Sequence, residues 1–240
     1  MIKKKQGVNL VDTGGRKMKL KLIGIGGCGV NTADYIGSQK ISGVTCAAID
    51  TDHITLENSE LKEKLLFDKV TGGRGAGGLV DTGKNACEEE TDEIKKILSD
   101  ADVIILAAGM GAGTGTGASS VIARITKENG AKVLAAVFHP YEFEGPFKLQ
   151  NSVKGIKELS KYTDSILIVE TKFAKDKETH KPEIFGIQFS KSEIKEIHEK
   201  MSFAAARELF FKEVLEFVKT AASKSTGELK ENYFTGYTVF

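Results

Sequence analysis

The most informative stretch of this 240-residue chain is residues 109–117, which read GMGAGTGTG. Five glycines in nine positions would lose too much backbone entropy in a regular element, so we predict a loop held open for a ligand. A helix is expected to begin near Thr116, and its unpaired N–H groups and positive dipole end would suit an anion such as a phosphate. Thr114 and Thr116 add hydroxyl donors. The alternative is a glycine-rich surface turn without a ligand.

A second glycine-rich segment, GIGGCG, lies near the start of the chain. Its residues Gly24, Gly26 and Gly29 give a G-x-G-x-x-G pattern between an expected strand and an expected helix. Asp50 follows 21 residues after Gly29, at the end of a second expected strand, residues 44–49. On these residues alone, a dinucleotide-binding Rossmann unit with Asp50 on the ribose is the leading interpretation.

A third glycine cluster, TGGRGAGGL, spans residues 71–79 and precedes an expected helix over residues 81–99, with Asp81 as its N-cap. One dinucleotide site does not usually need three separate glycine loops. A nucleotide with a long polyphosphate, enclosed from several sides by peptide N–H groups, would use all of them.

Strand-like and helix-like segments alternate along the chain, which predicts an α/β fold with a doubly wound, mainly parallel sheet and helices on both faces. The expected strands are residues 18–25, 44–49, 102–108, 132–138 and 164–169, and a further helix is expected near residues 146–161. In such sheets ligands bind at the carboxyl ends of the strands, where all three glycine loops fall.

The remaining segments divide the chain further. Residues 1–17 are interpreted as a flexible arm, and residues 18–189 as the nucleotide-binding α/β domain, ending in a polar, irregular stretch at 171–189. Residues 190–224 predict a long helix packed on that domain, and residues 225–240 an aromatic tail. No second domain is expected.

The expected long helix opens with a capping box formed by Ser190 and Glu193. It carries two apolar stripes, one of Ile194, Ile197, Met201, Ala204, Phe211, Leu215 and Val218, the other of Phe203, Phe210, Val214 and Phe217. One stripe is expected to face the sheet and the other a partner, so self-association is predicted.

Composition excludes several function classes. Lys plus Arg number 34 against 33 for Asp plus Glu, so no overall field draws the chain to nucleic acid or to an acidic membrane. No apolar run approaches the roughly 20 residues of a membrane span, and the first residues lack a signal core. Cys28, Cys46 and Cys87 lack metal-binding spacing, which favours a reducing, cytoplasmic location. Cys28 could be a nucleophile, but a small residue facing the loop is favoured.

With these motifs in view, the sequence resembles the tubulin and FtsZ family, whose signature is a GGGTGTG or GGGTGSG loop. GMGAGTGTGA is joined in the right order by IGIGGCGVNTA, by AIDTD at 48–52, by GRGAGG at 73–78 and by HPYEFEG at 139–145. The resemblance covers about residues 18–222 and implies a domain that binds GTP or GDP with Mg²⁺. It also implies a six-stranded parallel sheet followed by a central helix.

The resemblance further implies roles for individual residues. The α- and β-phosphates would be held by Gly26, Gly27, Gly29 and Asn31, and the β- and γ-phosphates by Gly111, Ala112, Gly113, Thr114, Gly115 and Thr116. Ala76, Gly77 and Gly78 would close over the γ-phosphate, while Thr51 and Asp52 would lie near it and its magnesium ion. Glu144 would bind the ribose. Cys28, Gly109 and Pro140 belong to the same motifs and are included among the nucleotide contacts. No direct metal ligand is predicted.

Several positions depart from the family pattern. Lys148 stands where the family has a ribose-binding Arg, and Thr171 where it usually has Asn beside the base. Phe203 matches the base-stacking aromatic residue. Arg207 stands where the family has Asp or Asn, whose oxygen accepts from guanine, and an arginine has no acceptor. Guanine selectivity would then require Glu208 to turn toward the base. After the long helix the chain reads STGELKENYF in place of an N-x-D-x-x-D loop that activates the attacking water, with Glu228 or Glu231 as possible substitutes.

The leading hypothesis is therefore a GTP- and GDP-binding protein that associates with itself or with a related FtsZ-like subunit. GTP hydrolysis is expected to be slow on its own or to depend on assembly. Two alternatives stay open: an NAD(P)-binding Rossmann oxidoreductase, and an assembly module that has lost its nucleotide.

Overall fold

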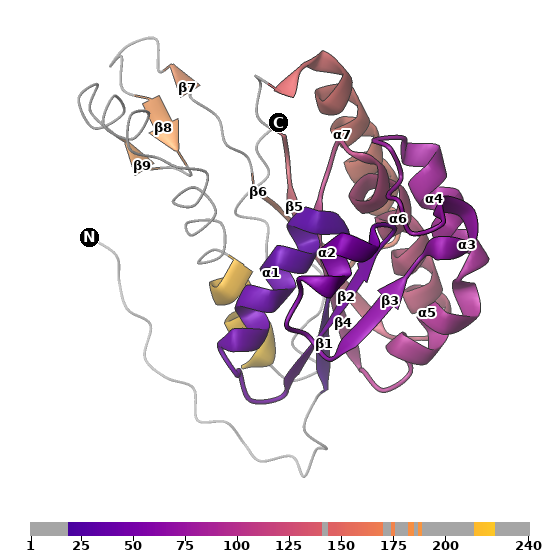
Figure 1. Cartoon of the computed structure of the whole chain (residues 1–240). Coiled ribbons are helices and arrows are strands. Elements are labelled where there is room, and N and C mark those ends of the chain that lie inside the picture. The colour runs from indigo at the N-terminus through magenta and orange to yellow at the C-terminus, as the bar shows by residue number, and fades with distance from the viewer. Residues whose placement is uncertain are drawn as a thin grey trace.

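The computed structural model describes residues 19–140, 144–169, 174–175, 182–184, 187–188 and 214–223. Its main body is a six-stranded sheet, parallel throughout, with the strand order β3-β2-β1-β4-β5-β6 (Figure 1). The strands are β1 Leu20–Ile25, β2 Val44–Asp50, β3 Glu63–Leu66, β4 Val103–Gly109, β5 Lys132–Phe138 and β6 Ser165–Val169. The predicted parallel α/β fold is confirmed.

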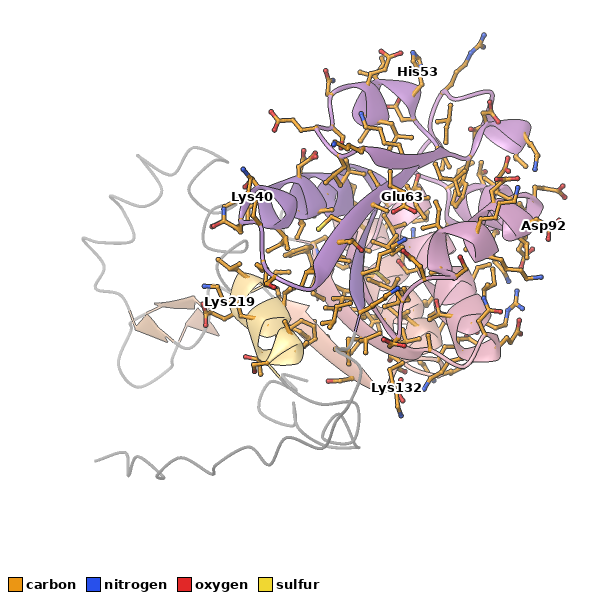
Figure 2. All side chains as sticks on the ribbon, turned by 90° about the horizontal axis from the view of Figure 1, so that it is seen from below. Lys40, His53, Glu63, Asp92, Lys132 and Lys219 are labelled. Carbon is orange, nitrogen blue, oxygen red and sulfur yellow. The ribbon has the colours of Figure 1, made fainter. Side chains whose placement is uncertain are left out.

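Helices cover both faces of this sheet. They are α1 Gly26–Ser38, α2 His53–Glu57, α3 Asp68–Thr71, α4 Val80–Glu89, α5 Thr91–Leu98, α6 Gly113–Glu128 and α7 Pro146–Leu159, together with residues 214–222. Apolar side chains of α4, α5, α6 and α7 pack on one face, and those of α1 and residues 214–222 on the other. Figure 2 shows Asp92 of α5 and Lys219 of the last helix on opposite sides of the sheet.

The central strands explain why the sheet is buried. Every residue of β1 is buried, and so is every residue of β4 before Gly109. Strands covered by helices on both faces need continuous apolar runs, which VIILAA supplies in β4. The charged exception, Lys21, carries its ammonium nitrogen to the carbonyl oxygen of Ile97 at 2.8 Å and to Asp100 at 2.7 Å.

The strand order places the ligand side of the sheet. Successive strands run outward from β1 in one direction and from β4 in the other, so the point where the connections reverse lies between these two strands. Segments that leave their carboxyl ends turn in opposite directions there and leave a crevice. The first and the last of the three glycine-rich segments follow β1 and β4 at this crevice.

The GMGAGTGTG stretch differs from the expected loop. Helix α6 begins at Gly113 rather than near Thr116, so Gly113, Gly115 and Gly117 lie in its first turns. A Cβ atom on Gly117 would overlap the backbone of Val80, and one on Gly115 would overlap the carbonyl group of Gly109. These glycines therefore let α6 approach α4 and β4 closely. Their role is packing within a helix, whereas an open ligand-binding loop was predicted.

Helix α4 contributes to the same contact. A Cβ atom on its Gly83 would overlap the carbonyl group of Gly113. The single helix expected over residues 81–99 is divided into α4 and α5 at Glu90, which caps both. Asp81 lies in the first turn of α4 and is not its N-cap, which is Leu79.

Two other segments depart from the sequence predictions. Six strands were expected, but the position of β3 was not predicted; β3 is four residues long, and its residues are only partly buried or exposed. Residues 171–189 are not wholly irregular, because β7 Ala174–Lys175, β8 Pro182–Ile184 and β9 Ile187–Gln188 form a small antiparallel sheet. These strands are short and have no long apolar run of their own, so hydrogen bonding to neighbouring strands defines them.

The end of the predicted long helix is present as residues 214–222. Val214 and Phe217 come from one predicted apolar stripe, and Leu215 and Val218 from the other, and all four are buried. Both stripes of this described part therefore pack within the chain, so it offers no free stripe to a partner. The arm at 1–17, the rest of the long helix and the tail from 225 lie outside the described residues. Within the described residues no helix has the length and apolarity to cross a bilayer.

We expect Gly117→Ala to destabilise the fold, because its new methyl group would meet backbone atoms of Val80 and Lys84 that cannot move aside independently. Overpacking of this kind costs about 1–3 kcal/mol. Gly27→Ala is the matched control, since a Cβ atom there meets nothing within 4 Å and alanine favours the helix by about 0.5–1 kcal/mol. Urea unfolding of both variants measures the difference, and equal stability would contradict the close-packing role.

Candidate functional site

A cavity of about 570 Å³ opens at the carboxyl ends of β1, β2, β4 and β5. It is lined by most of the predicted nucleotide contacts: Gly26, Gly27, Cys28, Asn31, Thr51, Asp52, Ala76, Gly78, Gly109, Ala112, Gly113, Thr114, Gly115, Pro140, Glu144 and Lys148. Three glycine-rich segments that are far apart in the sequence thus meet around one space.

The first wall is the start of α1. Its N-cap position, Ile25, makes no side-chain capping bond, so the N–H groups of the first turn have no side-chain partner at that position. Gly26, at φ +70°, and Gly27 and Cys28 line the cavity. Gly29 does not line it, because it packs α1 against the carbonyl group of Ala107 in β4, which a Cβ atom would overlap.

The second wall is the start of α6. Its N-cap, Ala112, has no side chain that could cap the helix, and no acidic residue lies in the first turn. The turn before it is held by Gly111, at φ +103°, whose N–H donates to the Thr116 hydroxyl at 2.7 Å. Neither Gly111 nor Thr116 lines the cavity, and the Thr116 hydroxyl holds the turn before α6.

The third wall combines the end of β2 with the glycine cluster at 72–78. The Gly75 N–H donates to the carbonyl oxygen of Thr51 at 2.9 Å, and the His53 N–H donates to that of Gly73 at 3.0 Å. Asp52 caps α2 by accepting from the Ile54 N–H at 3.1 Å. Gly75 and Ala76 line the cavity, as does Gly78 at φ +77°; Gly77 lies outside the lining.

At the fourth side, Glu144 and Lys148 form an ion pair, with 2.9 Å between Oε2 and Nζ. Lys148 lies in the first turn of α7, and Glu144 lies two residues before the helix, so the ion pair joins the helix to the segment that enters it. His139 also lines the cavity, and its Nδ1 lies 2.7 Å from the Ser152 hydroxyl. This side offers both a carboxylate and an ammonium group to a polar ligand.

Several lining residues were not among the predicted nucleotide contacts: Ile25, Thr32, Asp50, Thr55, Gly75, Met110, Phe138 and His139. Most of them adjoin a predicted contact at a strand end, so extending each motif by one or two residues would have included them. Asp50 was expected on a ribose in the Rossmann interpretation. Asp50 is only 3% exposed, and its carboxylate accepts from the backbone N–H groups of Thr51 and Asp52. Thr171, Phe203 and Arg207 lie outside the described residues.

The chemistry of the donors fits phosphate rather than a cation held by protein side chains alone. In the described part of the chain no cluster of three or more His, Cys, Asp or Glu residues could hold a metal ion. Two uncapped helix N-termini supply N–H groups and positive dipole ends, which favour oxygen anions. Mg²⁺ commonly uses one or two carboxylates with phosphate oxygens and waters, an arrangement compatible with these donors.

Cys28 faces the cavity, and its side chain is exposed to solvent there. The protein around the cavity still desolvates the thiolate and, with a smaller contribution from the Glu144 carboxylate, raises the pKa of the thiol to about 12. A thiol with such a pKa stays protonated near neutral pH and is a weak nucleophile. The structure therefore favours the predicted role of a small residue facing the site.

Taken together, these features define a doubly wound α/β domain with its ligand cavity at the switch point of the sheet. The model of the tubulin/FtsZ family GTPase domain matches residues 19–175. The chain therefore belongs to the tubulin/FtsZ family. The cell division protein FtsZ of Buchnera aphidicola subsp. Baizongia pistaciae is 42% identical over 151 residues, which is 62% of this chain and 39% of that protein. The FtsZ of Aquifex aeolicus is 36% identical over 152 residues, 63% of this chain and 41% of that protein.

Solved structures agree with this assignment. An FtsZ dimer of M. jannaschii, described as empty, superposes with a TM-score of 0.73 at 29% identity, covering 88% of this chain and 57% of that one. GDP-bound CetZ1 from Haloferax volcanii has a TM-score of 0.68 at 19% identity, covering 88% and 62%, and shares the fold. The chain spans about two fifths of the curated relatives it matches.

We expect alkylation of Cys28 by iodoacetamide at pH 8 to be slow in the folded protein, because its raised pKa leaves little thiolate. The rate should increase as the pH rises toward 12, and unfolding in urea should remove the protection. Cys46, whose pKa burial also raises to about 12, is the internal reference. Peptide mass spectrometry measures each site, and rapid labelling of folded Cys28 at pH 7 would restore the nucleophile hypothesis.

Proposed function

We propose that this chain binds GTP and GDP in the cavity at the carboxyl ends of β1, β2, β4 and β5. The observation that carries the proposal is the meeting of two helix N-termini, those of α1 and α6, without a side-chain cap on either. Each helix leaves its first N–H groups unpaired and contributes a positive dipole end. A chain of phosphates would supply acceptors to both helices at once.

The phosphates would be divided among the three glycine-rich segments. Gly26, Gly27 and Asn31 would hold the α- and β-phosphates, and the start of α6, Gly113 to Gly115, would hold the β- and γ-phosphates. The cluster at 72–78 would close over the γ-phosphate through Ala76 and Gly78. Mg²⁺ would be shared between phosphate oxygens and water, and it would neutralise part of the phosphate charge.

The Glu144–Lys148 pair would meet the ribose. Glu144 can accept from ribose hydroxyl groups, while Lys148 can donate from a single nitrogen, unlike the two-pronged contact of an arginine. A bound ribose would have to hydrogen-bond to Glu144 and Lys148 while they remain paired, or separate them. The base would be contacted by Thr171, Phe203 and Arg207, which lie outside the described residues.

We further infer that the protein associates with itself or with a related subunit, and that its own GTP hydrolysis is weak. Support comes from similar solved structures, which include an FtsZ dimer and a CetZ2 protofilament. Residues 225–234 read STGELKENYF, which lacks the spaced acids that activate water in the family. Glu228 or Glu231 could supply only part of that set.

The Rossmann oxidoreductase stays the second candidate because the strand order 3-2-1-4-5-6 is also that of dinucleotide-binding sheets. Against it, the Asp50 carboxylate is buried and engaged by the backbone, and two further glycine-rich segments at the cavity would have no task. Enhanced NADH fluorescence at micromolar protein would favour this candidate.

We expect the protein to bind GTP and GDP, and Gly78→Asp to weaken binding about tenfold, because a new carboxylate would face the phosphates. Gly78→Asn is the matched control: asparagine tolerates the positive φ as aspartate does but adds no charge. Titration calorimetry with GTP, GDP and ATP measures both effects. If wild-type protein binds no nucleotide, the proposal is wrong and an assembly module without nucleotide is favoured. Equal nucleotide affinities of Gly78→Asp and Gly78→Asn would show that no phosphate lies beside Gly78.

We expect phosphate release per molecule to be slow and independent of protein concentration, because no acidic loop would act on a neighbour's nucleotide. Phosphate release and light scattering, followed together over a hundredfold range of protein concentration with GTP, measure this. A specific rate that rises with concentration would show assembly-coupled hydrolysis and contradict the assignment of a missing activating loop.

A further inference from the structure

A buried carboxylate lies next to the phosphate-binding end of α6. Asp50, at the end of β2, accepts through Oδ1 from the backbone N–H groups of Thr51 at 2.7 Å and Asp52 at 3.3 Å. The Thr51 hydroxyl lies 3.5 Å from the same oxygen. The hydroxyl oxygens of Thr51 and Thr114 are 2.6 Å apart, and both residues are buried and line the cavity.

The acceptor at the end of this chain sets its direction. A hydroxyl has one proton to donate, and an ionised carboxylate only accepts. With Asp50 ionised, Thr51 directs its proton to the carboxylate and Thr114 directs its own to Thr51 or to Asp50. Thr114 then presents lone pairs, not a proton, to the cavity.

A phosphate also only accepts, so the two acceptors compete for the same protons. We propose that a phosphate bound at the start of α6 reverses the hydrogen bond between Thr114 and Thr51, and that Asp50, by opposing this reversal, limits the affinity for phosphate. The inference rests on the proposed function of the cavity. It makes Asp50 a positioning residue that acts through the two hydroxyls.

The reversal leaves Asp50 less well solvated. Thr114 would donate to the phosphate and Thr51 to Thr114, while Asp50 would keep only its two backbone N–H donors. None of the side chains that shift the pKa of Asp50 is a cation: Asp52 is a second carboxylate, Leu66 of β3 pairs with Asp50, and α6 contributes the Thr114 hydroxyl. The positive end of α6 favours the ionised carboxylate, but it would be shared with a bound phosphate. Desolvation already raises the pKa of Asp50, against the hydrogen bonds to its carboxylate.

The reversal therefore couples phosphate binding to a proton. Because Asp50 would hold its proton more tightly in the occupied site than in the free one, binding takes up protons and affinity rises as the pH falls. A protonated carboxyl group can donate to Thr51, and Thr51 in turn to Thr114 and Thr114 to the phosphate. The whole chain then points toward the ligand.

Asp50→Asn tests this direction, because an amide can donate to Thr51 at any pH. We expect this variant to bind GDP about fivefold to tenfold more tightly than wild type at pH 8, with the gap narrowing as the pH falls. The ratio of the two dissociation constants cancels the titration of the nucleotide's own phosphates. Titration calorimetry in two buffers of different ionisation enthalpy should show proton uptake in the wild type and less in the variant.

The hydroxyl chain is tested by Thr51→Val and Thr51→Ser. The valine variant keeps the shape but removes the hydroxyl that links Thr114 to Asp50, so Thr114 can donate to the phosphate unopposed through Thr51. It should bind GDP more tightly than wild type at pH 8 and gain little more from Asp50→Asn, whereas the serine variant should behave like wild type. Thr126→Val is the matched control, since Thr126 is equally buried but its hydroxyl bonds only to Ile122 within α6. The control should leave GDP affinity unchanged.

The outcomes separate this inference from the proposed function. If wild-type protein binds no GDP, both fail. If it binds GDP but Asp50→Asn binds equally or less tightly at pH 8, the inference alone is overturned. Weaker binding by that variant with Mg²⁺ but not with EDTA would likewise overturn it, because it would show that Asp50 supports a cation rather than opposes a phosphate.

Discussion

The close approach of α6 to its neighbours is the constraint on which the rest of the site depends. The first turns of α6 have no Cβ atoms at Gly113, Gly115 and Gly117, and each missing atom corresponds to a backbone or side-chain contact with α4, β4 or the glycine cluster. This lets the helix start against the end of β4, beside the start of α1. Larger side chains would push the helix outward and separate the two N-termini.

The cavity carries local features that do not stabilise the isolated chain. Two helices begin without a side-chain cap, and a carboxylate is buried beside one of them. Natural sequences usually satisfy such groups, and exceptions concentrate where a ligand completes them. An anion would satisfy the helix ends, but it would compete with the carboxylate for the threonine protons. The same few residues would therefore both attract a phosphate and regulate how strongly it is held.

Much of the fold could be predicted because the central strands have a clear sequence signal. Each is an apolar run buried on both faces, and each expected strand agrees with the structure within about two residues. The short edge strand β3 could not be found this way, since an edge strand has one neighbour and only four residues, of mixed burial. The break at Glu90 was also hidden, because no glycine or proline marks it. Its carboxylate is buried against Lys69 of α3, at 2.7 Å, which is a contact across the fold.

The sequence by itself determined that three glycine-rich segments follow or adjoin strands of a parallel sheet, since glycine patterns and apolar runs are local properties. Only the tertiary structure decided what each glycine does, because packing and ligand contact both require a missing Cβ atom and differ only in what lies beside it. A Cβ atom added to Gly29, Gly115 or Gly117 would overlap protein backbone. One added to Gly27 or Gly78 would meet no atom of the described chain within 4 Å. The tertiary structure also decided the state of Asp50: the same carboxylate would suit a ribose if exposed, and its burial next to two hydroxyls gives it a different task.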